Sequence, residues 1–471
     1  MIPARLVAGL LLAIAAGFMG PGPATVRAAD EFDASGPEDA ASLSAAARAA
    51  TSADDYAEGL RLARRALAKA AHGTAQEATA RLALGEALFR AGRLEEAGIA
   101  FRRCLHLAPE TAAAYAGLGR YLLTVPDYQA AGHAFRRAYQ LDPHDPRVLR
   151  RLAGLVTTRD EALRLYAHYL ELPPVEEDVV VNNVRAWVAM LEAAAGRMLY
   201  RLEGEAAAGT VRLTRAKGVP WVDVAVAGQR ARPFLLDSGA SAVSLPDSVF
   251  RRLHLQPVAE FKVRGVSGTP RKSLFVLLPE LAVGPFILHD VPAVVLPPRS
   301  DAPAILGLSL LAPLTPVLQG GRRLVLDRRG GAPRDCPRDP WWRMRPVGGL
   351  LRIDADLDGD LLHVIFDTGA ARSVLSRAAL QRLGLEESVG GSATRLIGFT
   401  GAAEQVGRVK RRGTLSFLGR SAGVRGMAVL DLKSTSRTAG SEIDGIIGND
   451  FLGSDTYQVD YRRGRIRVQA P

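Results

Sequence analysis

Two short motifs, each at the end of an apolar run, constrain the fold of this chain more than any other feature. Asp237-Ser238-Gly239 follows the apolar run at 233–236, and Asp367-Thr368-Gly369 follows the apolar run at 364–366. Either tripeptide alone is a weak signal, because Asp, Ser, Thr and Gly are common residues. Two carboxylates in matching surroundings indicate instead a repeated structure that brings both to the ends of strands.

The sequence around the two motifs repeats in the same order. A glycine-containing segment, an apolar run with Gly inside it and a closing strand follow each motif. In the first and second copies these landmarks lie at 264–269 and 397–402, at 304–311 and 445–452, and at 324–327 and 457–460. Short β-branched runs between Gly and Pro indicate all-β structure. The repeat therefore predicts two β lobes, at 209–327 and 347–468, joined by a linker at 328–346.

Both halves resemble the retropepsin-like aspartic proteases, with two copies fused in one chain. This resemblance implies that the lobes form a pseudo-dimer and that Asp237 and Asp367 are a catalytic dyad. Two carboxylates held close together cannot both ionise easily, so such a pair shares one proton and activates a water molecule. By the same resemblance no metal or cofactor is required, and the substrate is a peptide or protein.

The residues next to each Asp have supporting roles by the same resemblance. Ser238 and Thr368 are expected to form hydrogen bonds across the lobe boundary and so hold the two carboxylates in place. Gly239 and Gly369 allow the backbone to turn beside each carboxylate. The four residues are therefore predicted to support the dyad and not to react themselves.

Two glycine-bracketed segments occupy the place of the flaps, which are mobile hairpins that close over substrate in this family. They are Gly265-Val266-Ser267-Gly268 and Gly398-Phe399-Thr400-Gly401. Two glycines around two residues are typical of a hairpin tip. Two such segments favour a cleft with two flaps, and Val266 and Phe399 favour apolar substrate side chains there.

One departure separates the two halves. In the second, Gly448 is followed by Asn449-Asp450, which are polar as the family prefers, whereas the first has Leu308-Ser309 at the same place. This difference indicates that the first lobe has drifted structurally. Because both Asp motifs are intact, Asp237 is still expected to be catalytic.

The region before the β lobes repeats with a period of 34 residues. Seven positions recur at this spacing: Leu84, Gly85, Leu88, Ala97, Phe101, Cys104 and Pro109, matched by Leu118, Gly119, Leu122, Ala131, Phe135, Ala138 and Pro143. The pattern resembles tetratricopeptide repeats and predicts an all-α solenoid over 56–203 that recruits a protein partner or substrate. The polar, Ala-rich residues 29–55 are expected to be a loose lead-in.

The first 28 residues have the pattern of a secretory signal peptide, because the apolar stretch at 6–19 is short for a membrane span. Together with the Ala, Arg and Gly bias, this predicts a bacterial periplasmic or secreted protein; the alternative is an uncleaved N-terminal membrane anchor. The net charge of +11 is spread widely, without a basic stripe interleaved with aromatics, so no nucleic-acid partner is expected. Two distant cysteines, Cys104 and Cys336, predict neither a disulfide framework nor a metal site.

The sequence thus predicts a multidomain aspartic endopeptidase: a tetratricopeptide solenoid followed by two retropepsin-like lobes. The first alternative is a non-catalytic scaffold or peptide-binding protein that retains the protease fold. The second is an active site assembled between two chains. Carboxylates that face each other across one water, within one chain, would favour the single-chain enzyme.

Overall fold

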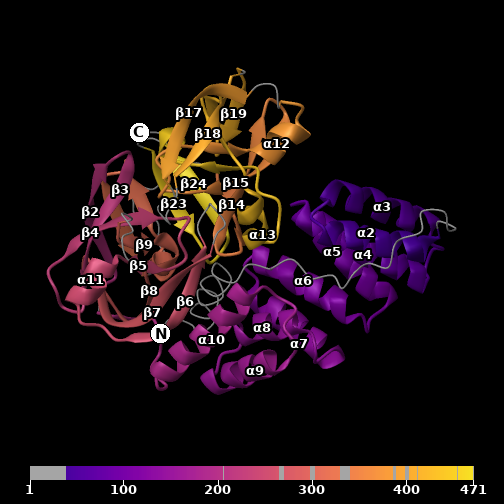
Figure 1. Cartoon of the computed structure of the whole chain (residues 1–471), viewed down its shortest axis with the longest axis horizontal. Helices are drawn as coiled ribbons and strands as arrows, with labels where there is room; N and C mark the ends of the chain where they lie inside the picture. Colours follow the sequence, from indigo (N-terminus) through magenta and orange to yellow (C-terminus); the bar gives the residue numbers. More distant parts are fainter. Residues whose placement is uncertain are drawn as a thin grey trace. The chain divides into compact units, whose positions relative to one another are not determined.

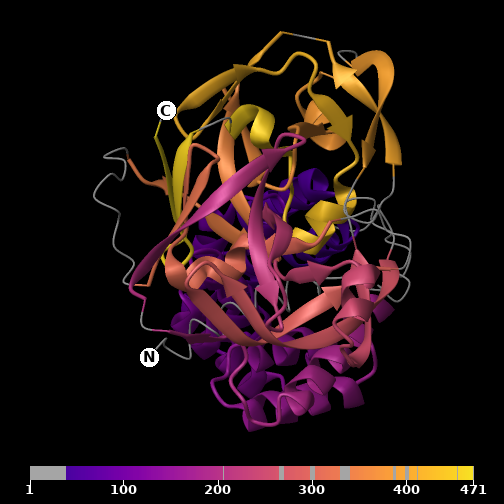
Figure 2. The same cartoon turned by 90° about the vertical axis from the view of Figure 1, so that its left-hand side faces the viewer.

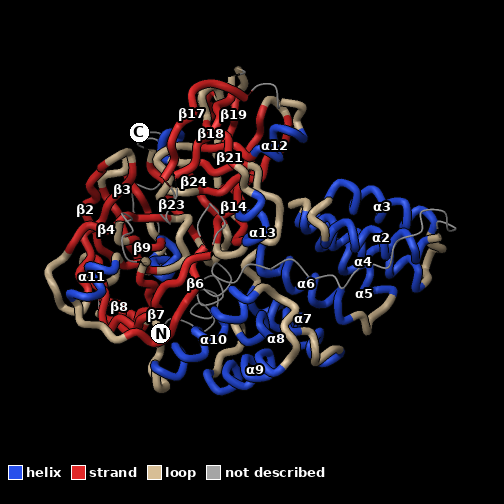
Figure 3. The backbone as a smooth tube through the Cα atoms, in the orientation of Figure 1, coloured by secondary structure: helices blue, strands red, loops and turns tan. Residues whose placement is uncertain are grey.

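A computed structural model of the protein describes residues 39–204, 206–264, 270–297, 303–328, 340–385, 389–397, 403–410, 412–452 and 455–469. The predicted signal peptide at 1–28 lies outside these residues. The chain divides into two compact units, a helical unit that runs to Val181 and a β unit that begins at Asn182 (Figure 1). Helices dominate the first unit and strands the second (Figure 3). None of the described helices is long and apolar enough to span a membrane.

The helical unit is built from consecutive helices. They are α2 (Ala40–Ser52), α3 (Tyr56–Lys69), α4 (Ala75–Arg90), α5 (Leu94–Leu107), α6 (Ala112–Thr124), α7 (Tyr128–Leu141), α8 (Pro146–Ala153) and α9 (Arg159–Glu171). Phe101 of α5 packs between two glycines, because a Cβ atom at Gly85 would lie 2.7 Å from its Cε1 and one at Gly117 would lie 2.5 Å from its Cζ. Phe135 packs against Gly119 in the same way, at 2.9 Å. A contact between a phenylalanine and a glycine of the preceding helix therefore recurs after 34 residues, and the predicted solenoid is confirmed.

Helix α2 corrects one expectation. Asp39 caps the helix by accepting a hydrogen bond from the Ser42 backbone N–H at 2.7 Å. Ala47 is fully buried against Ala63 and Ala83. The lead-in predicted at 29–55 is therefore helical and packed from Ala40 onward. Its small residues carry little hydrophobic periodicity, but they allow helices to approach closely.

The boundary between the units also lies earlier than predicted, within α10 (Asp178–Ala193). The Asn183 side chain donates to the Lys262 carbonyl and accepts from the Lys262 backbone N–H, both at 2.9 Å. The Trp187 ring lies 6.0 Å from the Phe275 ring. The end of the helical domain predicted at 56–203 thus packs on the first β lobe and belongs to the β unit.

The first lobe contains the strands β1 (Arg201–Glu203), β2 (Ala208–Ala216), β3 (Val219–Val226), β4 (Arg232–Asp237), β5 (Val243–Leu245), β6 (Pro257–Arg264), β7 (Pro270–Val283), β8 (Phe286–Val295), β9 (Ile305–Gly307), β10 (Val317–Gln319) and β11 (Arg323–Asp327), with helices α11 (Asp247–Arg252) and η1 (Leu308–Leu314). The strand order is β2-β3-β4-β9-β5-β8-β7-β6, and β7 also pairs with β3, so the sheet closes on itself. At its centre β4 pairs in parallel with β9.

The second lobe contains β13 (Arg345–Val347), β14 (Leu350–Leu357), β15 (Asp360–Phe366), β16 (Val374–Ser376), β17 (Val389–Ile397), β18 (Ala403–Val409), β19 (Thr414–Phe417), β20 (Arg420–Gly423), β21 (Ala428–Leu430), β22 (Gly445–Ile447), β23 (Thr456–Asp460) and β24 (Arg465–Gln469), with helices α12 (Arg377–Arg382), α13 (Lys433–Ala439) and α14 (Asn449–Leu452). Here β15 pairs in parallel with β22, as β4 does with β9. The same connection therefore occurs in both lobes, which confirms the duplication.

A shared sheet joins the two lobes (Figure 2). Strand β10 of the first lobe pairs with β23 of the second, with Val317 opposite Gln458. The order β24-β23-β10-β11-β2 is thereby continuous across the boundary. The predicted linker at 328–346 contributes to both sheets at its end, because β12 (Trp342–Arg343) pairs with β24 and β13 pairs with β14. The lobes thus form a pseudo-dimer within one chain.

Candidate active site

Each Asp of the predicted dyad lies at the end of a strand that a parallel neighbour holds. Asp237 is the last residue of β4 and is opposite Gly307 of β9. Asp367 directly follows β15, and its backbone N–H donates to the Ile447 carbonyl at 3.0 Å. Both Asp residues are partly exposed, whereas Ser238 and Thr368 beside them are buried. Each strand therefore presents its carboxylate at the surface of a rigid sheet.

Backbone amides hold one oxygen of each carboxylate. Asp237 Oδ1 accepts from the N–H groups of Gly239 and Ala240 at 2.7 and 3.1 Å. Asp367 Oδ1 accepts from those of Gly369 and Ala370 at 2.8 and 3.1 Å. The same turn therefore forms in both lobes and leaves the second oxygen of each carboxylate available.

The two carboxylates face each other across the lobe boundary. A Cβ atom built on Gly239 would lie 2.9 Å from Asp367 Cγ, and one built on Gly369 would lie 2.5 Å from Asp237 Oδ2. The two side chains are within hydrogen-bonding reach of each other. Any side chain in place of either glycine would occupy the space of the opposite carboxylate, which explains the Gly at these two positions.

The hydroxyl residues form a symmetric lock between the lobes. Thr368 Oγ1 accepts from the Ser238 N–H at 2.9 Å and donates to the Leu236 carbonyl at 2.8 Å. Ser238 Oγ accepts from the Thr368 N–H at 2.9 Å and donates to the Phe366 carbonyl at 2.9 Å. Each hydroxyl thus satisfies two buried backbone groups of the opposite lobe. These four bonds fix the relative position of the two Asp loops.

Burial and mutual repulsion disfavour the doubly ionised dyad. Burial raises the pKa of Asp237 well above its ordinary value, and the charge of Asp367 raises it further. Burial also raises the pKa of Asp367. The pair therefore keeps one proton over a pH range in which isolated carboxyls are ionised. One member can then act as an acid while the other acts as a base.

The two Asp loops have different support from behind. In the second lobe, Asn449 Nδ2 donates to the carbonyls of Thr368 and Ala370 at 2.6 and 3.0 Å. In the first lobe the corresponding contact is a hydrogen bond from Ser309 Oγ to the Ala240 carbonyl, at 3.5 Å. The drift expected for the first lobe is thus a loss of hydrogen bonds behind the loop, while Asp237 itself keeps its place.

A further support in the second lobe was not predicted from the sequence. Asp450 Oδ1 accepts from the backbone N–H and the hydroxyl of Ser373 at 2.8 and 2.7 Å. Ser373 Oγ in turn accepts from the Gly448 N–H at 3.0 Å. Ser373 lies six residues after Asp367, so it ties the far end of the dyad loop to α14. Only the strand pairing, and no local motif, brings Ser373 and Asp450 together.

Two aromatic residues near the first Asp loop also escaped prediction. Trp221 is partly exposed and packs beside Ala240 on a cluster formed by Val219, Leu235 and Ile305. Tyr461 follows β23, and its pKa lies well above its ordinary value because of burial and the nearby Asp237. The shared sheet brings Tyr461 of the second lobe to the Asp of the first. Their proximity depends on that pairing and has no signal in the sequence.

Antiparallel strand pairs flank both predicted flap segments. Strand β6 pairs with β7, and β17 pairs with β18, in antiparallel fashion. The tips lie outside the described residues; they comprise Gly265, Val266, Ser267 and Gly268 in the first lobe and Gly398, Phe399, Thr400 and Gly401 in the second. The flaps therefore stay a prediction, with an antiparallel strand pair beside each segment.

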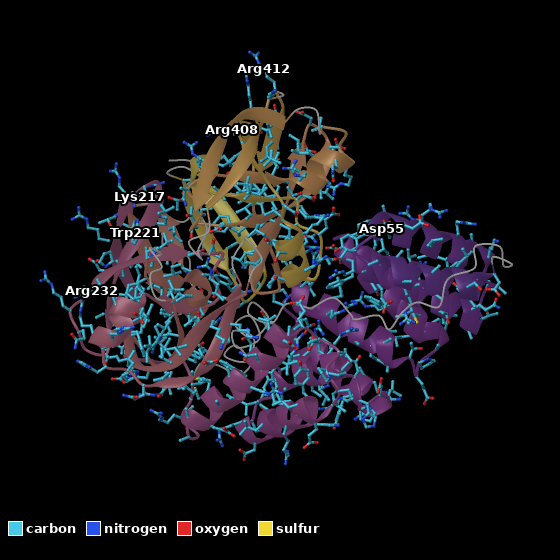
Figure 4. All side chains as sticks on the ribbon, viewed as in Figure 1. Asp55, Lys217, Trp221, Arg232, Arg408 and Arg412 are labelled. Carbon is cyan, nitrogen blue, oxygen red and sulfur yellow. The ribbon has the colours of Figure 1, made fainter. Side chains whose placement is uncertain are left out.

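Basic side chains are dispersed over the β unit. Figure 4 shows Lys217, Arg232 and Arg412 extending outward from different places, and all three are exposed. In the part of the chain that the structure describes, no cluster of three or more His, Cys, Asp or Glu side chains is arranged to hold a metal ion. Cys104 is buried with a free thiol in the helical unit.

Comparison with known proteins agrees with this geometry. Two segments, 222–310 and 353–451, match the model of a family described as aspartyl protease. They coincide with the two lobes and include both Asp loops, so the β unit is a two-lobed retropepsin-like protease fold. A solved structure titled "Functional Characterization of Pseudomonas Aeruginosa pilF" is 19% identical and covers 34% of this chain and 71% of its own, with a TM-score of 0.29. No curated protein matches the chain.

Proposed function

We propose that the protein is an aspartic endopeptidase that hydrolyses peptide bonds with a water activated by Asp237 and Asp367. The observation that carries this proposal is the pair of carboxylates facing each other across the lobe boundary, held by the lock of Ser238 and Thr368. Because both loops belong to one chain, no second chain is needed to complete the pair. This arrangement supports catalysis over a scaffold role, for which two partly buried carboxylates in contact would only be costly.

The chemistry follows from the shared proton. The ionised carboxylate takes a proton from the water as its oxygen attacks the peptide carbonyl carbon. The neutral carboxyl donates its proton to the carbonyl oxygen, which gives a neutral tetrahedral intermediate. Proton transfer to the leaving nitrogen then allows the C–N bond to break. The backbone amides of Gly239 and Gly369 keep the carboxylates in position throughout.

The helical unit would recruit a protein partner or a substrate, since solenoids of paired helices present extended surfaces for binding. The apolar stretch near the N-terminus supports secretion into the periplasm or the medium of a bacterium. Retention of that stretch would instead make it a membrane anchor.

The test compares cleavage of an unfolded protein by residues 29–471 and by single Asp variants, from about pH 4 to about pH 8. Asp237→Asn and Asp367→Asn are each expected to abolish new peptide termini. Asp223→Asn is the matched control, because Asp223 is an exposed carboxylate of β3 in the same lobe. Cleavage that survives either dyad substitution would refute the assignment. No cleavage by the unmodified protein at any pH would favour the non-catalytic scaffold.

Mixing the two single Asp variants tests the remaining alternative. If active sites formed between chains, the mixture would recover activity, because one hybrid site would contain both intact carboxylates. We expect no recovery.

A further inference from the structure

Four arginine residues lie on alternate helices of the helical unit. Arg90 belongs to α4, Arg120 to α6, and Arg147 and Arg151 to α8. All four are partly buried, so their guanidinium groups lie along the protein surface instead of extending freely into water. The Arg120 guanidinium stacks on the Phe89 ring, 4.7 Å from its centroid.

Carboxylates compensate the charges of these four arginines only in part. Arg90 pairs with Asp54, and the neighbouring buried Arg150 pairs with Glu176 at 2.8 Å. Within the described part of the chain, no carboxylate lies at ion-pair distance from Arg120, Arg147 or Arg151. We refer to these three residues as the arginine row.

Two carboxylates near Arg120, those of Glu86 and Asp145, are engaged elsewhere. Glu86 accepts from Arg48 at 3.1 Å. Asp145 caps α8 by accepting from the Arg147 backbone N–H at 2.8 Å. The arginine row therefore has no carboxylate partner of its own among the described residues: Arg120 stacks on Phe89, and Arg151 Nη1 donates to the Arg147 carbonyl at 3.2 Å.

The arginines lie close enough to affect one another. Burial lowers the pKa of Arg120, and the charges of Arg90 and Arg147 lower it further. Burial, together with Arg150 and Arg120, lowers the pKa of Arg151 to about 9. Like charges held together at a partly buried surface repel one another, and a bound anion would relieve this repulsion.

We propose that the arginine row binds an acidic peptide segment of a protein partner. The inference rests on the binding role proposed for the helical unit and is independent of peptidase activity. A guanidinium group binds a carboxylate through two parallel hydrogen bonds, and several along successive helices can engage several Asp or Glu side chains of an extended segment.

The neighbouring acidic residues favour a peptide over a nucleic acid. Glu86 and Asp145 lie close enough to the arginine row to affect its pKa values. A continuous phosphate backbone would be repelled by them. A peptide can place its carboxylates at the arginines and neutral residues elsewhere.

The test uses the full chain with Asp367→Asn, so that no peptide is cleaved. Fluorescence anisotropy measures binding of a short labelled peptide that alternates Glu and Ser, and of the same peptide with Gln in place of Glu. The Glu peptide is expected to bind at least about tenfold more tightly, with an advantage that declines as salt is raised. Equal affinity of the two peptides would overturn the inference. So would tighter binding of a single-stranded oligonucleotide of the same charge.

Charge reversal then identifies the surface. Arg120→Glu with Arg151→Glu should weaken binding of the Glu peptide about tenfold or more. Arg64→Glu with Arg103→Glu is the matched control, because both residues are exposed on α3 and α5 and the change in net charge is the same. The control should bind as the parent does; equal weakening in both would show a general charge effect and overturn the inference.

Two further measurements distinguish failure of the peptide-binding inference from failure of the proposed peptidase activity. Arg120→Gln with Arg151→Gln removes the charges without introducing new ones, so retained binding in this folded variant would also refute the proposal. Cleavage of an unfolded substrate without acidic residues, measured with the dyad intact, should be unchanged by the arginine substitutions. Loss of peptide binding with normal cleavage, or the converse, would therefore distinguish this inference from the proposed peptidase activity.

Discussion

Substitution of Thr368 by alanine tests whether the lock holds the lobes together. The change removes Oγ1, which leaves the Ser238 N–H and the Leu236 carbonyl without their partner in a fully buried place. Each orphaned group costs about 1–3 kcal/mol. The lost methyl group adds about 1 kcal/mol. The free energy of unfolding of the β unit should therefore fall by about 3–7 kcal/mol.

Thr368→Ser is the matched control, because it keeps both hydrogen bonds and should cost only about 1 kcal/mol. Urea denaturation followed by tryptophan fluorescence measures both variants, since Trp187, Trp221, Trp341 and Trp342 are all in the β unit. Peptidase activity should fall sharply in the alanine variant and persist in the serine variant. If the two variants unfold within about 1 kcal/mol of each other, the reasoning about orphaned groups is wrong.

Three further predictions concern the dyad and the helical unit. Gly369→Ala should abolish activity, because the new Cβ would lie 2.5 Å from Asp237 Oδ2; a cleavage assay with retained tryptophan fluorescence would show this, and a fully active variant would contradict it. Asp237→Asn should be inactive yet more stable than the unmodified protein at pH 7. A raised pKa favours the native state at low pH, and this stability is lost as pH rises from about 3.9 toward the raised value. Urea unfolding should therefore show the stabilities of the two proteins converging near about pH 4, and a constant difference between them would contradict the prediction. Gly117→Ala should destabilise the helical unit by about 1–3 kcal/mol, because its Cβ would lie 2.5 Å from Phe101 Cζ. Gly132→Ala in α7, with open space around it, should instead stabilise that unit by about 0.5–1 kcal/mol, and circular dichroism would reveal the opposite signs.

The duplication and the helical repeat could be predicted because each depends on a pattern along the chain. The 34-residue period predicted the helical solenoid, and its recurring glycines Gly85 and Gly119 pack against Phe101 and Phe135. Repetition of landmarks around Asp237 and Asp367 likewise predicted two equivalent lobes. In both cases one structural unit is formed by neighbouring residues, so its pattern survives in the sequence.

Features that depend on small residues or distant pairing could not be predicted. Helix α2 packs through Ala47, whose side chain is too small to produce a clear hydrophobic stripe. Ser373 and Asp450 are 77 residues apart, and Tyr461 reaches Asp237 only through the shared sheet. The sequence did identify Asn449 and Asp450 as unlike their counterparts in the first lobe, but not the groups that they hold.

Fusion of two lobes in one chain allows each Asp loop to be supported differently, which identical subunits of a symmetric dimer cannot do. The Asp367 loop is held from behind by Asn449 and Asp450, whereas the Asp237 loop has the longer contact from Ser309. The lock should therefore contribute more to the position of Asp237 than to that of Asp367.

Hydrogen exchange of the Thr368→Ala variant distinguishes the two loops. Backbone amides at 237–242 should exchange markedly faster than in the unmodified protein, because that loop loses a partner it cannot replace. Amides at 367–373 should change less, since Asn449 and Asp450 still hold that loop from within its own lobe. Equal acceleration in both loops would mean that the difference in support has no mechanical consequence. Faster exchange in the first loop alone would show that the second lobe positions the carboxylate of the first.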